Sequence, residues 1–186
     1  PSIEQARAAL QDSLQRRGSP AAAFFPETAH HQRRRYHQLC WPTDVLVRLP
    51  VTIVIPTRDR LHLLQECFEL LNETVNWSHV RLIIVDDHSR DPDALRFLDM
   101  IQRRPGLRCK VLRPDNPQAP FNYSHLVNLA LPHVETPLIL HLNNDVNALE
   151  PGWLEEMAGW FTQPDVGVVG AQLIYPDRSL NHTGIV

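Results

Sequence analysis

The chain has 186 residues, 43% of them hydrophobic, which is enough to bury a core of its own. Its 18 basic and 21 acidic residues leave a net charge of −3, which argues against nucleic acid or a charged membrane surface as a partner. Because there is no apolar run of about 18 residues and no signal pattern, the sequence predicts a cytoplasmic protein without a transmembrane segment.

Residues 1–50 are predicted to form an N-terminal extension, partly helical and partly irregular. Ser2 lies three positions before Gln5, the spacing of a capping box, and apolar residues then recur at helical intervals up to Gly18. Residues 19–50 contain four prolines and a basic run at residues 30–37. That run either contacts phosphates or an acidic partner, or is simply a solvated face.

From residue 51 onwards, short apolar runs alternate with helical periodicity, which is typical of βα units around a parallel sheet. The predicted strands, in chain order, are residues 51–55, 81–85, 109–112, 137–142 and 166–170. Helices are predicted after the first four, and Asp91 and Pro92 begin the second helix as N-cap and first helical residue. Pro56 is predicted to end the first strand, because a proline cannot donate to a sheet ladder.

The run at residues 137–142 is apolar on both faces, so it is predicted to be a central strand covered by helices on both sides. It is followed by Asn143, Asn144 and Asp145. Ligand crevices of open α/β sheets lie at the carboxyl ends of the strands, and these three side chains are predicted to lie in one. The alternative is a polar turn or helix cap before Pro151.

Asp86 and Asp87 follow the second predicted strand, so a parallel sheet would bring them to the same edge as Asp145. Three carboxylates in one crevice repel one another unless a cation or hydrogen-bond donors are bound there. A divalent metal with a phosphorylated ligand, or a base or ribose, would relieve this repulsion. The alternative for Asp86 and Asp87 is an N-cap and turn before Pro92.

Several nucleotide-binding classes are disfavoured by what the sequence lacks. It contains no glycine-rich phosphate loop, which disfavours Rossmann dehydrogenases and P-loop enzymes. A phosphorylatable receiver domain pairs acids at a strand end but needs a lysine downstream, and Lys110 is the only lysine in the chain. A nucleotide would therefore be held by carboxylates, a metal and arginines.

Six blocks of sequence, in order, resemble family 2 glycosyltransferases and are most similar to the bacterial polysaccharide-type members. They are VTIVIPTRDR (51–60), IVDDHS (84–89), PFNYS (120–124), LNNDV (142–146), GWL (152–154), and VGVVGA (166–171) followed by LNHTG (180–184). The resemblance implies a GT-A fold, a mostly parallel α/β sheet flanked by helices that binds a nucleotide-sugar. It covers about residues 50–186, so the expected domains are the extension 1–50 and a GT-A domain 51–186, truncated at its C-terminus.

The resemblance also implies roles for residues at two of the strand ends. Pro56, Thr57 and Asp59 would line the nucleoside pocket of the donor. Asp86 or Asp87 would accept hydrogen bonds from the base.

At the third strand end, Asn143, Asn144 and Asp145 take the place of the family's metal-binding Asp-x-Asp element. Asp145 would be the ligand of a divalent metal, Mg²⁺ or Mn²⁺, and the two asparagines would contact the donor. Asn143 stands where the first acid of the element would be. One carboxylate, diphosphate oxygens and waters would then hold the metal.

The activity that the resemblance implies is sugar transfer, with inversion, from a UDP- or dTDP-sugar to a saccharide or lipid-linked saccharide in cell-surface polysaccharide synthesis. The family's catalytic base lies well downstream of the Asp-x-Asp element, so it is expected beyond Val186, and residues 1–186 alone are expected to be inactive. The full-length protein would be cytoplasmic, with peripheral attachment at the inner membrane face as an option. Two alternatives stay open: a non-catalytic nucleotide-sugar-binding module and a sugar nucleotidyltransferase.

Overall fold

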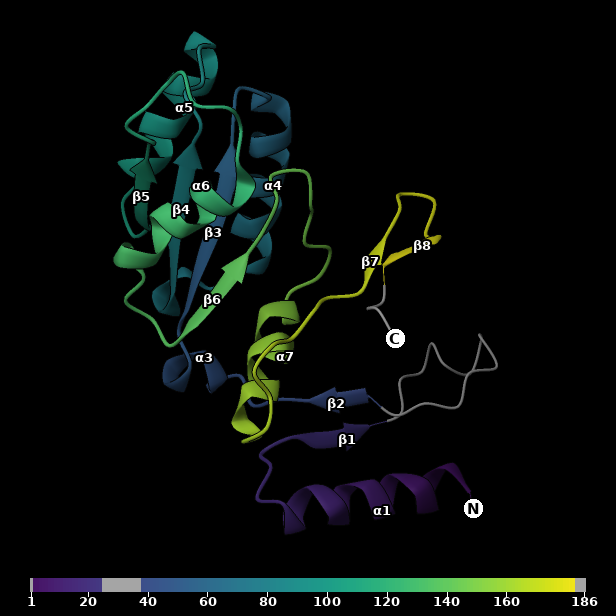
Figure 1. The fold of residues 1–186 in the computed structure, drawn as a ribbon. Coiled ribbons are helices and arrows are strands. Elements are labelled where there is room, and N and C mark those ends of the chain that lie inside the picture. The colour runs from purple at the N-terminus through teal and green to yellow at the C-terminus, as the bar shows by residue number, and fades with distance from the viewer. Residues whose placement is uncertain (1, 25–37, 183–186) are drawn as a thin grey trace. The chain divides into compact units, whose positions relative to one another are not determined.

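A computed structural model of the protein describes residues 2–24 and 38–182. The chain forms two compact units, Leu46–Trp153 and Pro1–Val45 with Leu154–Val186 (Figure 1). The basic run at residues 30–37 lies outside the described residues, so neither interpretation of it is tested.

The unit Leu46–Trp153 is built on a four-stranded parallel sheet with the strand order β5-β4-β3-β6. The strands are β3 (Val51–Thr57), β4 (Val80–Asp86), β5 (Arg108–Leu112) and β6 (Leu138–His141). β3 and β4 are central and almost wholly buried, because apolar side chains cover both of their faces. The predicted α/β fold with a parallel sheet is confirmed.

Helices cover both faces of this sheet. They are α4 (Leu61–Thr74), α5 (Pro92–Gln102) and α6 (Tyr123–Ala130), with a short α3 (Val45–Arg48) before β3 and the 3₁₀ turns Trp77–His79 and Leu131–His133. In Figure 1, α6 lies in front of the sheet and α4 behind it. The ring of Phe68 in α4 meets that of Phe97 in α5 edge to face, with centroids 6.1 Å apart, so these two helices pack together.

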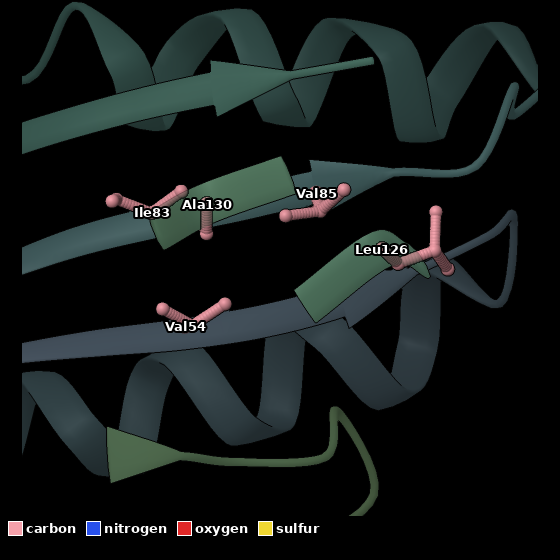
Figure 2. Close-up of a cluster of buried hydrophobic side chains, with 5 residues drawn as sticks. All are labelled: Val54, Ile83, Val85, Leu126 and Ala130. Atoms are coloured by element: carbon pink, nitrogen blue, oxygen red, sulfur yellow. The ribbon is translucent and has the colours of Figure 1, made fainter. Parts of the chain in front are cut away.

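The core under α6 joins the two central strands. Leu126 and Ala130 of α6 pack on Val54 of β3 and on Ile83 and Val85 of β4 (Figure 2). All five side chains are almost fully buried. At about 25 cal/mol per Å² of buried apolar surface, such a cluster fixes α6 across β3 and β4.

Two helix starts in this unit use the side-chain caps that their sequences offer. Asp91 caps α5 by accepting a hydrogen bond from the N–H of Asp93, with Pro92 as the first helical residue, as predicted. Asn122 caps α6 by accepting from the N–H of His125. These caps fix where the chain leaves the strand-end loops.

The prediction that residues 137–142 form a central strand is wrong. β6 is an edge strand, paired with β3 alone in the described part of the chain. Leu138 and Leu140 are half-buried, whereas Ile139 and His141 are exposed. An apolar run shows how many faces of a strand are apolar, but it carries no information on whether one or both edges are paired.

Pro56 lies inside β3, so the predicted end of that strand at residue 55 is also wrong. Pairing with β4 continues through both Pro56 and Thr57. On the other edge of β3, the carbonyl of Val54 accepts a hydrogen bond from the N–H of Leu142 at 3.0 Å, and the pairing with β6 ends there. Because backbone groups alternate along a strand, the nitrogen of Pro56 faces this unpaired side, where no N–H is needed.

The unit Pro1–Val45 with Leu154–Val186 begins with α1 (Ile3–Arg16), whose predicted capping box between Ser2 and Gln5 is confirmed. β1 (Ala22–Phe24) pairs antiparallel with β2 (Gln38–Cys40). Its further elements are α7 (Trp153–Gly159), which begins at the last residue of the other unit, the 3₁₀ turn Trp160–Thr162 and the hairpin of β7 (Leu173–Ile174) with β8 (Leu180–His182).

A tryptophan is the centre of packing in this second unit. Trp41 belongs to a buried cluster with Leu14, Ala21 and Ala23. A Cβ placed on Gly159 would collide with the Trp41 ring, so only glycine fits this contact.

Residues 166–170 do not form the predicted fifth strand. Val168 is 90% exposed, and the run pairs with no other described segment. The apolar residues of this run favour an extended backbone, although its two glycines weaken that preference. A strand also needs a neighbouring strand to pair with.

Among the described residues, no helix is both long enough and apolar enough to span a bilayer.

Candidate functional site

The chain reverses its direction across the sheet between β3 and β6. From β3 it passes to β4 and then to β5 on one side, and α6 returns it over the sheet to β6 on the other side of β3. In open α/β sheets the ligand crevice lies at such a switch point, outside the carboxyl ends of the strands. Thr57 ends β3 at this point, and its Oγ1 accepts a hydrogen bond from Nδ2 of Asn144 at 3.0 Å.

Asp86 ends β4 next to the switch point and is fully buried. Its Oδ1 accepts a hydrogen bond from the N–H of Ser89 at 3.0 Å, and its Oδ2 accepts one from Nε of Arg113 at 2.8 Å. Both oxygens therefore have protein partners, and the carboxylate holds the loop after β4.

Asp87 is the more open of the two neighbouring acids. Its backbone N–H donates to the carbonyl of Thr57 at 2.8 Å, which fixes the main chain. Its carboxylate has one long contact, 3.4 Å from Oδ2 to Nη1 of Arg58, and the side chain keeps 10% of its exposure. Of the acids after β4, Asp87 is thus the one that can still accept hydrogen bonds from a ligand.

The two arginines at this edge are residues that sequence reasoning missed. Arg113 pairs with Asp86 and Arg58 with Asp87, so the expected repulsion between the acids is partly relieved within the protein. Their positions do carry a signal, because Arg58 directly follows β3 and Arg113 directly follows β5. The rule that drew attention to the strand-end acids selects strand-end cations equally well.

Asp59 belongs to the loop after β3 but faces the loop after β4. Its Oδ1 accepts hydrogen bonds from the N–H groups of Arg90 at 2.6 Å and Asp91 at 2.9 Å. Its own N–H donates to Oγ of Ser89 at 2.6 Å. The hydrogen bonds from Asp91 and Arg90 lower the pKa of the Asp59 carboxyl, with Arg58 and Arg90 adding favourable charge.

Asn143 and Asp145 lie on an exposed turn closed by a hydrogen bond from the N–H of Val146 to the carbonyl of Asn143, 3.2 Å long. The turn is tied to α4 where Nδ2 of Asn147 donates to Oε1 of Glu66 at 2.9 Å. Within the described residues, the Asp145 carboxylate has no hydrogen bond or ion pair.

The charge of Asp145 contributes to the raised pKa of a buried thiol in α4. Burial raises the pKa of the Cys67 thiol to about 12, with further contributions from the charges of Asp145 and Glu66.

The donor set for a metal is small. No group of three or more His, Cys, Asp or Glu side chains in the described ranges could hold an ion. An exposed carboxylate flanked by amide oxygens is nevertheless a hard oxygen donor set, which suits Mg²⁺ or Mn²⁺ when a ligand supplies further oxygens.

A separate hollow of about 260 Å³ lies beside β5. It is lined by Leu95, Leu98, Asp99, Gln102, Val111 and Arg113. Arg113 alone also takes part in the strand-end network, so this hollow is not the switch-point crevice.

Comparison with known proteins identifies the family. Residues 52–184 match the sequence profile of glycosyl transferase family 2. The chain belongs to this family. The matched range contains β4, β6 and all of β3 except Val51, with all of the strand-end residues described above.

Two curated proteins are similar in sequence to this chain over most of its length. It is 30% identical over 178 residues to the O-antigen biosynthesis protein RfbC of Myxococcus xanthus, covering 96% of the chain and 13% of that protein. It is 38% identical over 136 residues to an uncharacterized protein, y4gI, of Sinorhizobium fredii, covering 73% of the chain and 14% of that protein. The chain thus spans about one seventh of the length of these relatives.

Solved structures of similar fold include two complexes with a nucleotide-sugar. A mannosyltransferase from Pyrobaculum calidifontis in complex with GDP-Man and Mn²⁺ matches with a TM-score of 0.55 and 22% identity, over 64% of this chain and 34% of that chain. A truncated S. aureus TarS in complex with UDP-GlcNAc matches with a TM-score of 0.52 and 17% identity, over 67% and 38%. The expected GT-A fold is confirmed.

Proposed function

We propose that this family 2 domain binds a nucleotide-diphospho-sugar at the carboxyl ends of β3, β4 and β6, as the donor side of a polysaccharide glycosyltransferase. The observation that carries the proposal is the meeting of Thr57 and Asn144 at the topological switch point, beside the partly open carboxylate of Asp87. Family membership supplies the chemical class.

The residues at the site divide into two kinds in this proposal. Asp87 accepts hydrogen bonds from the base, and Pro56, Thr57 and Asn144 line the nucleoside side of the crevice. Asp86 is engaged on both oxygens and supports the loop that carries Asp87.

Asp145, with Asn143 beside it, would hold a divalent metal. A bound metal would stabilise the charge of a leaving nucleoside diphosphate. The support is an exposed carboxylate, without a hydrogen bond or ion pair in residues 2–24 and 38–182, in the place of the family's metal-binding element. That the mannosyltransferase of similar fold was solved with GDP-Man and Mn²⁺ agrees with this assignment.

The donor nucleotide is proposed to be UDP or dTDP, and the acceptor a saccharide or lipid-linked saccharide. The similarity to RfbC, a protein named for O-antigen biosynthesis, supports a role in polysaccharide synthesis. Inversion at the transferred sugar is part of the same proposal.

Calorimetry on the 186-residue chain tests the donor site. UDP, dTDP and GDP are titrated with and without Mn²⁺, and at least one should bind with saturable affinity. Replacing Asp87→Ala should weaken that affinity by at least about tenfold, because a hydrogen bond to a charged group contributes roughly 1.5–3 kcal/mol. Asp99→Ala, which removes an exposed carboxylate on α5, is the matched control. Equal affinity in all three proteins would refute the assignment of Asp87.

A further inference from the structure

Two neighbouring loops are joined by one side chain. The loop after β3 contains Asp59 and Arg60, both non-glycine residues in the left-handed region, with φ of 49° and 47°. The loop after β4 contains His88, with φ of 58°. Non-glycine residues stay in this region only where surrounding contacts hold them, because the conformation costs roughly 1 kcal/mol or more.

The contacts that hold both loops meet at Asp59. One of its carboxylate oxygens accepts two consecutive backbone N–H groups, those of Arg90 and Asp91. Its own N–H donates to Oγ of Ser89, which is buried. Three hydrogen bonds of 2.6–2.9 Å therefore link one residue of the first loop to three consecutive residues of the second.

The link continues from Ser89 to the acids at the end of β4. The N–H of Ser89 donates to Oδ1 of Asp86, and the N–H of His88 donates to the carbonyl of Asp86 at 2.8 Å. Asp87 lies within this closed loop, two residues before Ser89. The anchor at Asp59 therefore acts on the position of Asp87 from the Ser89 side, together with β4 and the hydrogen bond from the Asp87 N–H to Thr57.

We infer that Asp59 is a positioning residue, which acts on donor binding by fixing the loop that carries Asp87 and makes no contact with the nucleotide. This differs from the direct contact that the sequence resemblance implied for Asp59. The reason is geometric, because Oδ1 of Asp59 accepts the N–H groups of Arg90 and Asp91, and these two hydrogen bonds hold the side chain toward the loop after β4. The inference rests on the proposed donor site and names a further residue on which that site depends.

Two substitutions separate positioning from direct contact. Asp59→Asn keeps an oxygen that accepts from both amides and tolerates a positive φ, but removes the charge. Asp59→Gly removes the side chain and also tolerates the backbone angle. UDP affinity by calorimetry, with Mn²⁺ present, should fall about tenfold in Asp59→Gly and stay within about threefold of wild type in Asp59→Asn. Equal losses in both variants would show that the charge itself contacts the ligand, and would overturn the inference.

A double-mutant cycle with Asp87→Ala measures the coupling between the two residues in UDP affinity. General destabilisation of the fold would not produce such coupling. If Asp59 acts through Asp87, Asp59→Gly should cost less than twofold further in the Asp87→Ala background. A full tenfold loss there would overturn the inference. All affinities are measured well below the melting temperature of every variant, with Asp99→Ala as control.

Amide hydrogen exchange tests the link without any ligand. The N–H groups of Arg90 and Asp91 should exchange faster in Asp59→Gly than in Asp59→Asn, and unchanged rates would overturn the inference. A wild-type chain that binds none of UDP, dTDP and GDP would refute the proposed donor site and, with it, the role in binding. Additive effects in a chain that does bind would refute the inference alone.

Discussion

An aspartate lies at the carboxyl end of each of three strands: Asp59 after β3, Asp86 at the end of β4 and Asp145 after β6. The surroundings of these three carboxylates differ. Asp59 and Asp86 have carboxylates that are occupied by backbone N–H groups or an arginine. Asp145 lies on an exposed turn, and in the described structure its carboxylate has no such partner. The turn itself is fixed by one backbone hydrogen bond, to the carbonyl of Asn143, and one side-chain hydrogen bond, from Asn147 to Glu66.

The difference shows that the chemical role of a strand-end carboxylate depends on the backbone donors around it. An acid that accepts several N–H groups is part of the scaffold, because removing it leaves donors unsatisfied. An acid without protein partners is available to a metal or ligand. The following predictions test whether this division between loops and turn is correct.

The largest effect should come from Asp86→Ala. The buried N–H of Ser89 would lose its acceptor and Arg113 its partner, so the free energy of unfolding should fall by about 2 kcal/mol. Arg113 is half exposed, so water can solvate its charge and limit the loss. Urea unfolding measures this, and Asp145→Ala, expected to change stability by less than about 0.5 kcal/mol, is the matched comparison. Equal losses would remove the distinction.

Asp145→Asn should change ligand binding and spare the fold. The substitution keeps size and most hydrogen bonding but removes the charge, so UDP affinity should lose its dependence on Mn²⁺ while the melting temperature stays close to wild type. If Asp145 is only a turn residue, the result reverses. Stability would then fall by about 1 kcal/mol, and the metal dependence would persist.

Asn144→Ala tests the hydrogen bond that joins the turn after β6 to the end of β3. Losing the hydrogen bond from Asn144 to Thr57 should lower stability by about 1 kcal/mol. Thr57→Val removes the same bond from the other end, so the double variant should be no less stable than the worse single one. Additive losses in unfolding experiments would mean that the two side chains act independently.

The smallest effect concerns pH. The pKa of Asp59 is lowered on folding by the N–H groups of Asp91 and Arg90, with Arg58 and Arg90 as the charges facing it. A lowered pKa stabilises the fold above the unfolded value of about 3.9, and this stabilisation is lost as the pH falls through the folded pKa. The stability difference between wild type and Asp59→Asn should therefore shrink between about pH 5 and pH 3. A difference that stays constant in urea unfolding across this range would contradict the prediction.

Much of the fold could be predicted because its signals are local. The cap at Asp91, the capping box at Ser2 and the apolar runs of β3 and β4 each depend on residues a few positions apart. The wrong predictions concern pairing, which is not local. The run at residues 137–142 became an edge strand, and residues 166–170 found no partner among the described residues.

For the candidate site, the sequence could predict which residues follow the strands, and therefore which residues lie at the same edge of the sheet. Sequence order placed Thr57, Asp87 and Asn144 at one edge of the sheet, and the hydrogen bonds there agree with that placement. It could not show that Arg113 neutralises Asp86, or that Asp59 faces a loop some thirty residues further along the chain. Such contacts depend on how loops fold back, and no spacing rule encodes them.

Pro56 has a consequence for how this site can vary. The next rung of the ladder between β3 and β6 would need an N–H at residue 56 to donate to the carbonyl of Leu142, and proline has none. The backbone ladder between β3 and β6 therefore cannot continue past Leu142, and the side-chain hydrogen bond from Asn144 to Thr57 makes the next contact with β3. Substitutions at residues 143–147 should therefore leave the strand register unchanged, while β3 stays paired with β4 up to Thr57 and Asp86.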